Sequence, residues 1–451
     1  MLPPGLPTSS ASGVVHNALA RYHEHIRAAA RAVLAMRSDD LAIPLEPAET
    51  FPELTAVTDI GLEQIDQRTY LLDLMRNPGA RTTKTMASLL MVSRAISHIR
   101  RTGERVLVLT PTSGNKGTAL RDAIARAYAT GLTTPQQLRM AMVVPEQSRA
   151  KLRACPLTDD TSLHSANPVA VAEVRDPADV KELCASVAAS ESQNLLDTKG
   201  FRIWYTLDLD NYRIADSARA FAEAELLPIG ADSGPRLHAH AVSSAYGLLG
   251  YQLGVRVLAD GAGGLTAPAR HAGLFLVQQL ATPDMVTSLL GTKVPEYEYD
   301  PTTGYWRQES LPEFPATTDD PAETIDATFY TKAPATSIQI NRIVAQHGGG
   351  GVVVSKRECL ERFETVRGLA MNAGIAIDPN PERIREWSLV KVLTGVLVAR
   401  ERGLVAQHTD VVVHASGYYT DDLVPPLRDE HITRVRTAAD VATLIWAAAS
   451  A

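Results

Sequence analysis

The sequence predicts an α/β protein with largely parallel sheets. From about residue 100 to residue 415, short runs rich in Val, Leu and Met alternate with longer helical runs. Such alternation is typical of parallel strands joined by crossover helices. The chain has 451 residues and 45% hydrophobic content, which is enough for one large or two medium cores. We therefore expect two such sheets.

The overall charge and the apolar runs exclude several classes of partner. The chain has 44 basic and 51 acidic residues and a net charge of −7, so it lacks the basic footprint of a nucleic-acid-binding protein. Its first residues lack the charged and apolar regions of a secretory signal. No apolar run approaches the ~20 residues of a membrane span. We expect no nucleic-acid partner, no membrane contact and a cytoplasmic location.

The cysteines and histidines predict neither a disulfide framework nor a metal centre. Cys155, Cys184 and Cys359 are widely spaced and form no Cys-x-x-Cys pair. This usage agrees with a reducing compartment. The tightest histidine pairs, at 23/25 and 238/240, have no third ligand at a familiar spacing. We expect no bound metal.

The N-terminal 58 residues are expected to form a helix and an irregular arm. Apolar positions recur at three- and four-residue spacing from Val14 to about Met36, whereas residues 38–58 are rich in proline. The elements that follow are a strand at 69–75, a turn at 77–79 and a helix at 83–98.

The rest of the chain is expected to alternate between strands and helices up to residue 414. Strands are predicted at 106–109, 140–145, 169–174, 237–242, 274–278, 352–354 and 410–414. Helices are predicted at 117–128, 148–154, 177–191, 214–225, 246–253, 356–371 and 382–402. Residues 290–325, rich in Pro, Thr, Asp and Tyr, are expected to be a surface insertion. Ser355 and Glu358 have the spacing of a capping box for the helix at 356–371.

Lys84 is the first candidate functional residue, because it precedes a strongly apolar helical run. The run contains Met86, Leu89, Leu90 and Met91. A lysine at the start of a buried helix must be desolvated or bonded, and desolvation lowers its pKa, as an amine nucleophile requires. The alternative is an ordinary lysine on a helix surface.

A polar turn from Thr112 to Gly117 is the second candidate, because it links a predicted strand to the next predicted helix. Thr112 and Ser113 offer hydroxyl groups, and Asn115 offers a donor and an acceptor. Gly114 permits a bend with positive φ. The dipole of the following helix favours an anion at this turn. Alone the turn is weak evidence, but a nucleophilic lysine and an anion site together are what pyridoxal phosphate (PLP) requires.

Further segments complete an ordered set with these two. They are Asp210-Asn211-Tyr212-Arg213-Ile214, Thr331–Thr336, residues 348–355 and Val413–Asp422. Together with Asn77–Lys84 and Pro111–Gly117, this set resembles the motifs of the fold-type II PLP enzymes, the family of tryptophan synthase β, cysteine synthase and threonine synthase. The resemblance covers about residues 66 to 425 and is closest to the threonine synthase and cysteine synthase members.

The resemblance implies two parallel-sheet α/β domains of the tryptophan synthase β kind, with PLP in the cleft between them. Residues 59–90 and 203–451 would form the large PLP-binding domain, and residues 91–202 the small mobile domain. It also implies an amino-acid substrate and a homodimer.

The resemblance also implies a role for each candidate residue. Lys84 would form the Schiff base with PLP, and Asn115 would hydrogen-bond its 3′ oxygen. Ser416 would contact the pyridine nitrogen, where a neutral hydroxyl suits elimination and replacement better than transamination. The substrate would be held by Thr112, Ser113, Gly114 and Lys116. The phosphate cup would be formed by Ser243, Ser244, Ala245, Tyr246 and Gly247.

Three features depart from the pattern of that family. The first is that Thr85-Met86 stands where an acidic residue usually follows the lysine. The expected cup, Val242–Gly247, keeps only one glycine, although its hydroxyls and the start of the following helix would still bind phosphate. The other glycine-rich runs, at 261–264 and 348–351, are out of place for the cup, and we expect them to be loops. Lys116 replaces a small polar residue, and its charge indicates either a second anionic group on the substrate or simple solvation at the surface.

The sequence therefore predicts a PLP-dependent lyase or transferase. It would catalyse β- or γ-elimination or replacement on an amino acid, in the manner of threonine synthase and in a specialised biosynthetic role. The alternative is a non-catalytic relative that binds PLP or an amino acid and acts as a regulator or partner, which the altered cup motivates. A nicotinamide-dependent dehydrogenase is disfavoured, because no strand is followed by Gly-x-Gly-x-x-Gly and a later acidic residue.

Overall fold

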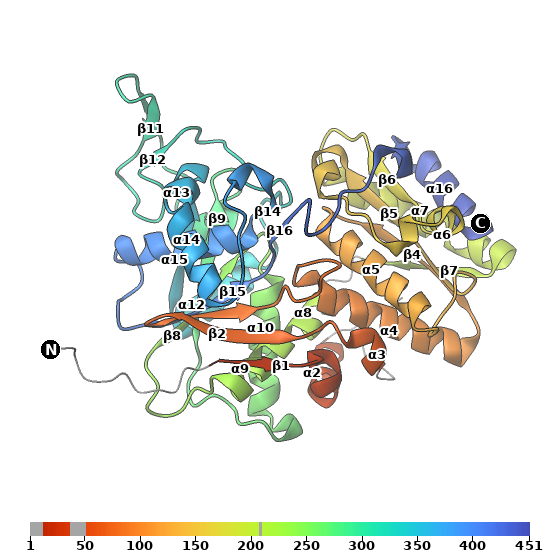
Figure 1. The fold of residues 1–451 in the computed structure, drawn as a ribbon, viewed down its shortest axis with the longest axis horizontal. Coiled ribbons are helices and arrows are strands. Elements are labelled where there is room, and N and C mark those ends of the chain that lie inside the picture. Colours follow the sequence, from red (N-terminus) through yellow and green to blue (C-terminus); the bar gives the residue numbers. More distant parts are fainter. Residues whose placement is uncertain (1–11, 37–50, 207–209) are drawn as a thin grey trace.

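Two large sheets organise the protein, and each carries its own covering of helices (Figure 1). The computed structural model describes residues 12–36, 51–206 and 210–451. One sheet has seven strands and the other has five. Most neighbouring strands run parallel. The predicted α/β fold with two largely parallel sheets is therefore confirmed.

The seven-stranded sheet forms the larger half of the molecule. Its strands lie in the order β1 (Gly13–Val15), β2 (Ile60–Asp66), β3 (Thr69–Asp73), β15 (Asp410–Ala415), β8 (Arg236–Ala241), β9 (Gly273–Gln279) and β13 (Gly349–Val354). From β3 to β13 all neighbours are parallel, whereas β1, β2 and β3 pair antiparallel. Adjacent residues such as Leu276 and Val277 belong to different hydrophobic clusters. The central strands are thus buried on both faces, which is why they read as continuous apolar runs.

The five-stranded sheet forms the smaller half and is entirely parallel. Its strands lie in the order β17 (Ile432–Val435), β6 (Val169–Ala172), β5 (Leu138–Pro145), β4 (Arg105–Pro111) and β7 (Phe201–Tyr205). The helices around it are α4 (Lys84–Thr102), α5 (Asn115–Ala129), α6 (Thr161–Ala166), α7 (Asp179–Lys199) and α16 (Ala438–Ser450). Val108 packs into one hydrophobic cluster and Leu107 into another, so this sheet is also covered on both faces.

The C-terminus returns to the smaller half. β17 forms the edge of its sheet beside β6, and α16 packs against α7. The Trp446 indole N–H donates to Glu191 Oε2 at 3.0 Å across that contact. The expected division assigned residues 203–451 to the larger domain, whereas these C-terminal residues and the end of β7 lie with the smaller sheet. Local sequence patterns do not reveal this return, because the long-range neighbour decides where an edge strand pairs.

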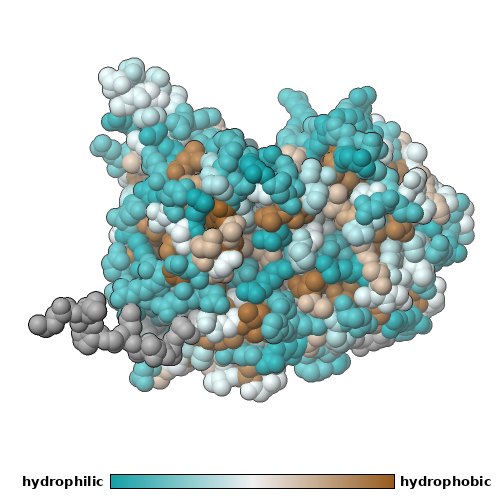
Figure 2. All heavy atoms as spheres, viewed as in Figure 1, coloured by the Kyte–Doolittle hydropathy of each residue, from teal (hydrophilic) through white to brown (hydrophobic). Residues whose placement is uncertain are grey.

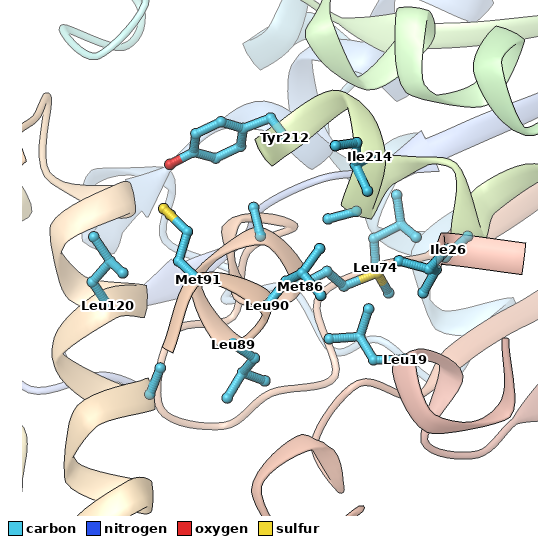
Figure 3. Packing of buried hydrophobic residues seen from close by; sticks show 14 of the residues in the cluster. Leu19, Ile26, Leu74, Met86, Leu89, Leu90, Met91, Leu120, Tyr212 and Ile214 are labelled. Atoms are coloured by element: carbon cyan, nitrogen blue, oxygen red, sulfur yellow. The ribbon is translucent and has the colours of Figure 1, made fainter. Parts of the chain in front are cut away.

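A layer of buried helices joins the two halves. α4 contacts both α5 and α8 (Asp210–Asp216), and Figure 3 shows Met91 of α4 with Leu120 of α5 and the Tyr212 ring of α8 around it. Beside them α10 (Tyr246–Ala259) crosses α8 closely. A Cβ at Gly250 would lie 2.4 Å from Asp216 Cβ, so this crossing requires glycine. The predicted buried character of the helix after Lys84 is confirmed.

The N-terminal region packs against this helical layer. The expected single helix at 14–36 is instead β1 followed by α1 (Ala18–Arg21) and α2 (His23–Leu34), because the left-handed backbone at Asn17 interrupts the chain. α2 contacts α8 and α10. Arg21 also pairs with Glu225 of α9 (Ala218–Leu226), with 2.6 Å between Nη2 and Oε1. Residues 38–50 of the expected arm lie outside the described residues, and α3 (Pro52–Thr55) follows them.

The expected helix at 382–402 is wrong in its first turn. Ile384–Glu386 forms the short strand β14, which pairs antiparallel with β16 (Tyr419–Thr420), and the helix α15 (Ser388–Glu401) begins afterwards. The Ser388 backbone N–H donates to Glu386 Oε1 at 3.0 Å. The Trp387 backbone N–H donates to Asp326 Oδ2 at 3.2 Å. Two buried carboxylates therefore set the start of this helix, and one of them is distant in sequence.

The predicted capping box at Ser355 and Glu358 is confirmed. The helix that it begins is divided at Arg362 into α13 (Lys356–Glu361) and α14 (Phe363–Asn372). The glycine run at 348–351 is mostly strand rather than loop, because β13 begins at Gly349. The remaining segments include α11 (Asp284–Leu290), α12 (Ser337–His347), and the antiparallel β10 (Glu298–Asp300), β11 (Tyr305–Arg307) and β12 (Thr317–Thr318). No helix in the described parts of the chain is long and apolar enough to cross a membrane.

Candidate functional site

A cavity of about 320 Å³ lies where the carboxyl ends of strands from the two sheets face each other. Figure 2 shows the molecular surface hollowed between the two lobes. The cavity is lined by the starts of α4 and α5, one residue of α7, the loop after β8, residues 328–331 and 334–336, and Ser416. Every predicted site residue except Gly114 lines it. Segments that are far apart in the sequence therefore meet at one place.

Lys84 is the first residue of α4 and faces the cavity. The backbone N–H of Thr83 donates to the carbonyl oxygen of Ser416 at 2.9 Å, which joins the start of α4 to the segment after β15. The Lys84 ammonium lies 4.9 Å from the centre of the Tyr212 ring. Burial lowers the pKa of Lys84, and although Asp216 opposes this shift, Arg219 adds to it. An amine with a depressed pKa is a better nucleophile at neutral pH.

The turn after β4 is shaped by Thr112 and Gly114. Thr112 Oγ1 accepts the backbone N–H groups of Gly114 at 3.1 Å and Gly117 at 3.2 Å. Gly114 has a φ of 117°, and a Cβ there would lie 2.6 Å from Lys151 Cβ. Gly114 is thus turned toward Lys151, so it shapes the turn without lining the cavity. Thr112, Ser113, Asn115 and Lys116 line it.

Asn115 is held by two residues that the sequence did not single out. Its Nδ2 donates to Glu386 Oε2 at 2.6 Å, and its Oδ1 accepts the Tyr419 hydroxyl at 2.8 Å. These contacts fix the orientation of the amide, with Nδ2 toward Glu386 and Oδ1 toward Tyr419. One Nδ2 hydrogen is left for a ligand, because an amide nitrogen carries two. The antiparallel pair β14–β16 brings both partners to this place.

A buried ionic group lies behind Asn115. The Lys151 ammonium is 2.7 Å from Asp326 Oδ2 and 2.9 Å from Glu386 Oε2. Although burial opposes it, these two carboxylates raise the pKa of Lys151. Lys391 lies beside the group and above the Phe329 ring, and burial lowers its pKa to about 8. Lys151 comes from the smaller half and both carboxylates from the larger, so the group ties the two halves together.

The cup from Ser243 to Gly247 is built without the usual glycines. Ala245 takes the left-handed conformation, with a φ of 53°, immediately before α10. Ser243 Oγ donates to Thr331 Oγ1 at 3.0 Å, and Thr336 Oγ1 donates to the Ser244 carbonyl at 2.7 Å. Residues 331–336 therefore cover the cup. Because the first turn of a helix presents N–H groups and a positive dipole end, this place suits phosphate.

Ala245→Gly is expected to stabilise the protein by roughly 1 kcal/mol, because glycine relieves the strain of a left-handed alanine. Urea unfolding followed by circular dichroism measures the change. Ala259→Gly, in the exposed last turn of α10, is the matched control and should cost up to ~1 kcal/mol. Equal destabilisation by both substitutions would show that Ala245 is not strained.

His240 and Arg219 complete the cavity wall, and neither was predicted from the sequence. Within the described chain, both ring nitrogens of His240 are buried and lack a hydrogen-bond partner. Burial holds the pKa of His240 well below its usual value, and Arg219 and Lys84 add to the shift. Arg219 is itself bonded to Asp216, at 2.7 Å from Nη2 to Oδ1, and to His414, at 2.9 Å from Nη1 to Nδ1. The only sequence signal was the His238/His240 alternation on a predicted strand.

The histidines and acidic residues do not gather into a metal site. Nowhere in residues 12–36, 51–206 and 210–451 do three His, Cys, Asp or Glu side chains lie close enough to hold an ion. The polar groups around the cavity are hydroxyls, amides and cations. The cavity is therefore suited to an anionic organic ligand.

Comparison with solved structures identifies the fold. Threonine synthase from Escherichia coli matches with a TM-score of 0.51 and 11% sequence identity, over 95% of this chain and 90% of that chain. PLP-bound threonine synthase from Brucella melitensis gives a TM-score of 0.49 and 13% identity, over 99% of this chain and 93% of that chain. The first match shows that the tryptophan synthase β-like fold extends over nearly the whole chain. At this identity it shows the fold alone.

Comparison at the level of sequence gives the family. No curated protein matches the chain. The model of a family of unknown function, DUF6002, matches residues 14–449. This match includes both sheets and every segment of the cavity. The chain therefore belongs to the DUF6002 family, whose activity is not established, and has the fold of threonine synthase.

Proposed function

We propose that this protein is a PLP-dependent lyase or transferase that carries out β- or γ-elimination or replacement on an amino acid. The observation that carries the proposal is the convergence of Lys84, Asn115, Ser416 and the Ser243–Gly247 cup on one cavity. These residues were predicted as a cofactor site from separate segments of the sequence. Their meeting at one place, within the fold of threonine synthase, supports a shared ligand.

The residues around the cavity fit PLP. In the described part of the chain no Asp or Glu lines it, whereas Lys84, Lys116, Lys181 and Arg219 do, so the site favours a multiply charged anion. The unpartnered ring nitrogens of His240 also favour a polar ligand, because buried polar groups are almost always bonded. Lys84 would attach the aldehyde. The cup would hold the phosphate, and Ser416 would contact the pyridine nitrogen.

The chain's own residues would prepare and protect the reaction. When bound, PLP supplies an electron sink for negative charge that develops at the substrate Cα. Lys84, with its depressed pKa, would remove and return the Cα proton. Asn115, positioned by Glu386 and Tyr419, would hold the oxygen next to the aldehyde. Ser113 and the start of α5 would orient the substrate carboxylate.

A regulator that binds PLP or an amino acid without turnover is the second candidate. The left-handed Ala245 in the cup favours it, because the cup departs from the glycine-rich pattern of the family that the sequence resembles. The two candidates predict different behaviour of the same complex. An enzyme releases product from an amino acid, whereas a regulator changes spectrum or stability on binding and leaves the amino acid intact.

Reconstitution with PLP tests the proposal. The protein incubated with PLP and dialysed should keep a visible absorbance band, and borohydride should bleach the band and fix the label on the Lys84 peptide, as mass spectrometry would show. Release of a 2-oxo acid or a replaced amino acid from candidate substrates then separates the enzyme from the regulator. A colourless protein after incubation would exclude the enzyme and a PLP-binding regulator, and would leave only a regulator that binds an amino acid. The implied homodimer is tested separately by light scattering, where a monomeric mass would contradict it.

A further inference from the structure

We infer that the amino-acid substrate carries a second anionic group on its side chain, held by Lys116 and Lys181. The inference rests on the proposed function, because it concerns the part of the same cavity that PLP would leave open. The anionic group is a carboxylate or a phosphate.

Two cations in the cavity have no task in holding PLP. Lys84 would attach the aldehyde, and Arg219 already has a carboxylate partner, since Asp216 Oδ1 lies 2.7 Å from its Nη2. Lys116 of α5 and Lys181 of α7 also line the cavity, and no acidic residue among those that the structure describes does. A site for PLP and a neutral amino acid would not need both of these charges.

The two lysines and the cup reach the cavity from different halves of the molecule. Lys116 Nζ donates to the backbone carbonyl of Thr206 at 3.3 Å, just after β7. The Lys181 ammonium lies 6.0 Å from the centre of the Tyr330 ring, in the segment that covers the cavity. Both lysines thus extend from helices of the five-stranded half, whereas the cup belongs to the loop between β8 and α10. They are therefore placed for a group that projects away from the PLP phosphate.

No described carboxylate neutralises either lysine. Within residues 12–36, 51–206 and 210–451, neither forms an ion pair with a carboxylate, and the one hydrogen bond of Lys116 goes to a neutral carbonyl. Burial lowers the pKa of Lys116 to about 7, and the positive charge of Lys181 adds to the shift. Two close cations destabilise each other, and burial adds a loss of hydration at Lys116. An anionic group between them would offset both the lost hydration and the repulsion, whereas a neutral side chain would offset neither.

Spectral titration of the PLP-loaded protein with matched ligands tests this inference. Aspartate and asparagine, and glutamate and glutamine, differ in charge at nearly constant shape. O-phosphoserine and serine form a third pair, which separates phosphate from carboxylate. A charge-assisted contact with each lysine should make the preferred anionic ligand bind about tenfold to a hundredfold more tightly than its neutral partner. Neutral ligands that bind as tightly as all three anionic ones would overturn the inference.

Substitution of the lysines shows whether they cause the preference. Lys116→Gln and Lys181→Gln should each reduce the anionic-to-neutral affinity ratio by about tenfold, and Lys116→Arg should retain most of it. Lys332→Gln is the matched control, because Lys332 is exposed next to the cavity-lining Thr331 and does not itself line the cavity. An equal fall of the affinity ratio in Lys332→Gln would indicate long-range attraction instead of a site at Lys116 and Lys181. No fall in Lys116→Gln and Lys181→Gln would show that these lysines do not hold the anionic group, and either result would overturn the inference.

The pH dependence adds an independent measurement. In the empty cavity Lys116 is charged below a pKa of about 7 and neutral above it, and a bound anion raises that pKa. The affinity ratio of aspartate to asparagine should therefore fall as pH rises from 7 to 9, by up to tenfold per pH unit. The ratio in Lys116→Gln should be flat. A wild-type ratio that does not change would contradict the role of Lys116, whereas a protein that never takes up PLP would instead refute the proposed function together with this inference.

Discussion

Lys84→Ala is expected to remove the visible absorbance of the PLP-treated protein and to lower turnover by about 10²- to 10⁴-fold, the range that a positioned acid–base group contributes. Both the location of Lys84 and the pKa of its amine support this expectation. Lys84 begins α4 where that helix is tied to Ser416 through the Thr83 backbone, and burial gives it a depressed pKa. Absorbance spectra, borohydride labelling and single-turnover product release measure the two effects.

A matched control separates this role from a general loss of positive charge. Lys332→Ala removes an exposed lysine beside the cavity-lining Thr331, and it should keep both the absorbance and the turnover. The assignment of Lys84 would be contradicted if the Lys84→Ala variant still formed the absorbance band and carried the borohydride label on Lys116 or Lys181. One of those lysines would then be the reactive amine. Loss of the band in the control variant would point to unfolding or to long-range electrostatics.

Lys151→Met is expected to lower the free energy of unfolding by about 3–5 kcal/mol, because it leaves two buried carboxylates without their shared cation. The side chains of Asp326 and Glu386 are completely buried, and the Lys151 ammonium lies 2.7 and 2.9 Å from them. Methionine nearly preserves the volume, so the loss reports charge rather than packing. Denaturant unfolding measures this loss of stability. The hydrogen bond from Asn115 to Glu386 should also weaken, because Glu386 contacts both Asn115 and Lys151.

The outcome depends on whether a neighbouring lysine replaces the lost charge. Lys391 lies next to the same carboxylates and has a pKa lowered to about 8 by burial. A loss below about 1 kcal/mol in Lys151→Met would show that Lys391 takes over. If instead the full loss is seen, the double variant Lys151→Met with Asp326→Asn should recover part of it, since it removes one orphaned carboxylate. Lys293→Met, at an exposed position, is the control and should stay within about 0.5 kcal/mol.

The sequence was informative wherever a feature depends on neighbouring residues. The runs that became β4, β5, β9 and β15 are apolar because their strands are buried on both faces, so their pattern is visible in the sequence. The helix after Lys84 was recognised for the same reason. Ser355 and Glu358 form their capping box within one turn, and such local contacts need no knowledge of the fold.

Features that depend on distant partners were missed or misplaced. β14 interrupts an expected helix because it pairs with β16, more than thirty residues away. β17 and α16 join the smaller sheet although their residues follow the last strand of the larger one. Propensity favoured helix for residues 382–387, but the pairing with β16 and the buried carboxylates outweighed it, because tertiary contacts override weak local preferences.

The sequence by itself determined the fold class, because strand and helix periodicities are written along the chain. The site residues were predicted from their resemblance to ordered motifs of a known family, and their roles stay a proposal. Only the tertiary structure decided how that site is supported. It brought Glu386 and Tyr419 to Asn115 and placed Lys181 near Lys116 in one cavity. Among the described residues, it also left the ring nitrogens of His240 without partners and the cavity without an acidic side chain. Hydrogen bonds and charge interactions act over a few ångströms in space, so residues that are far apart in sequence acquire these roles only when the two sheets are assembled.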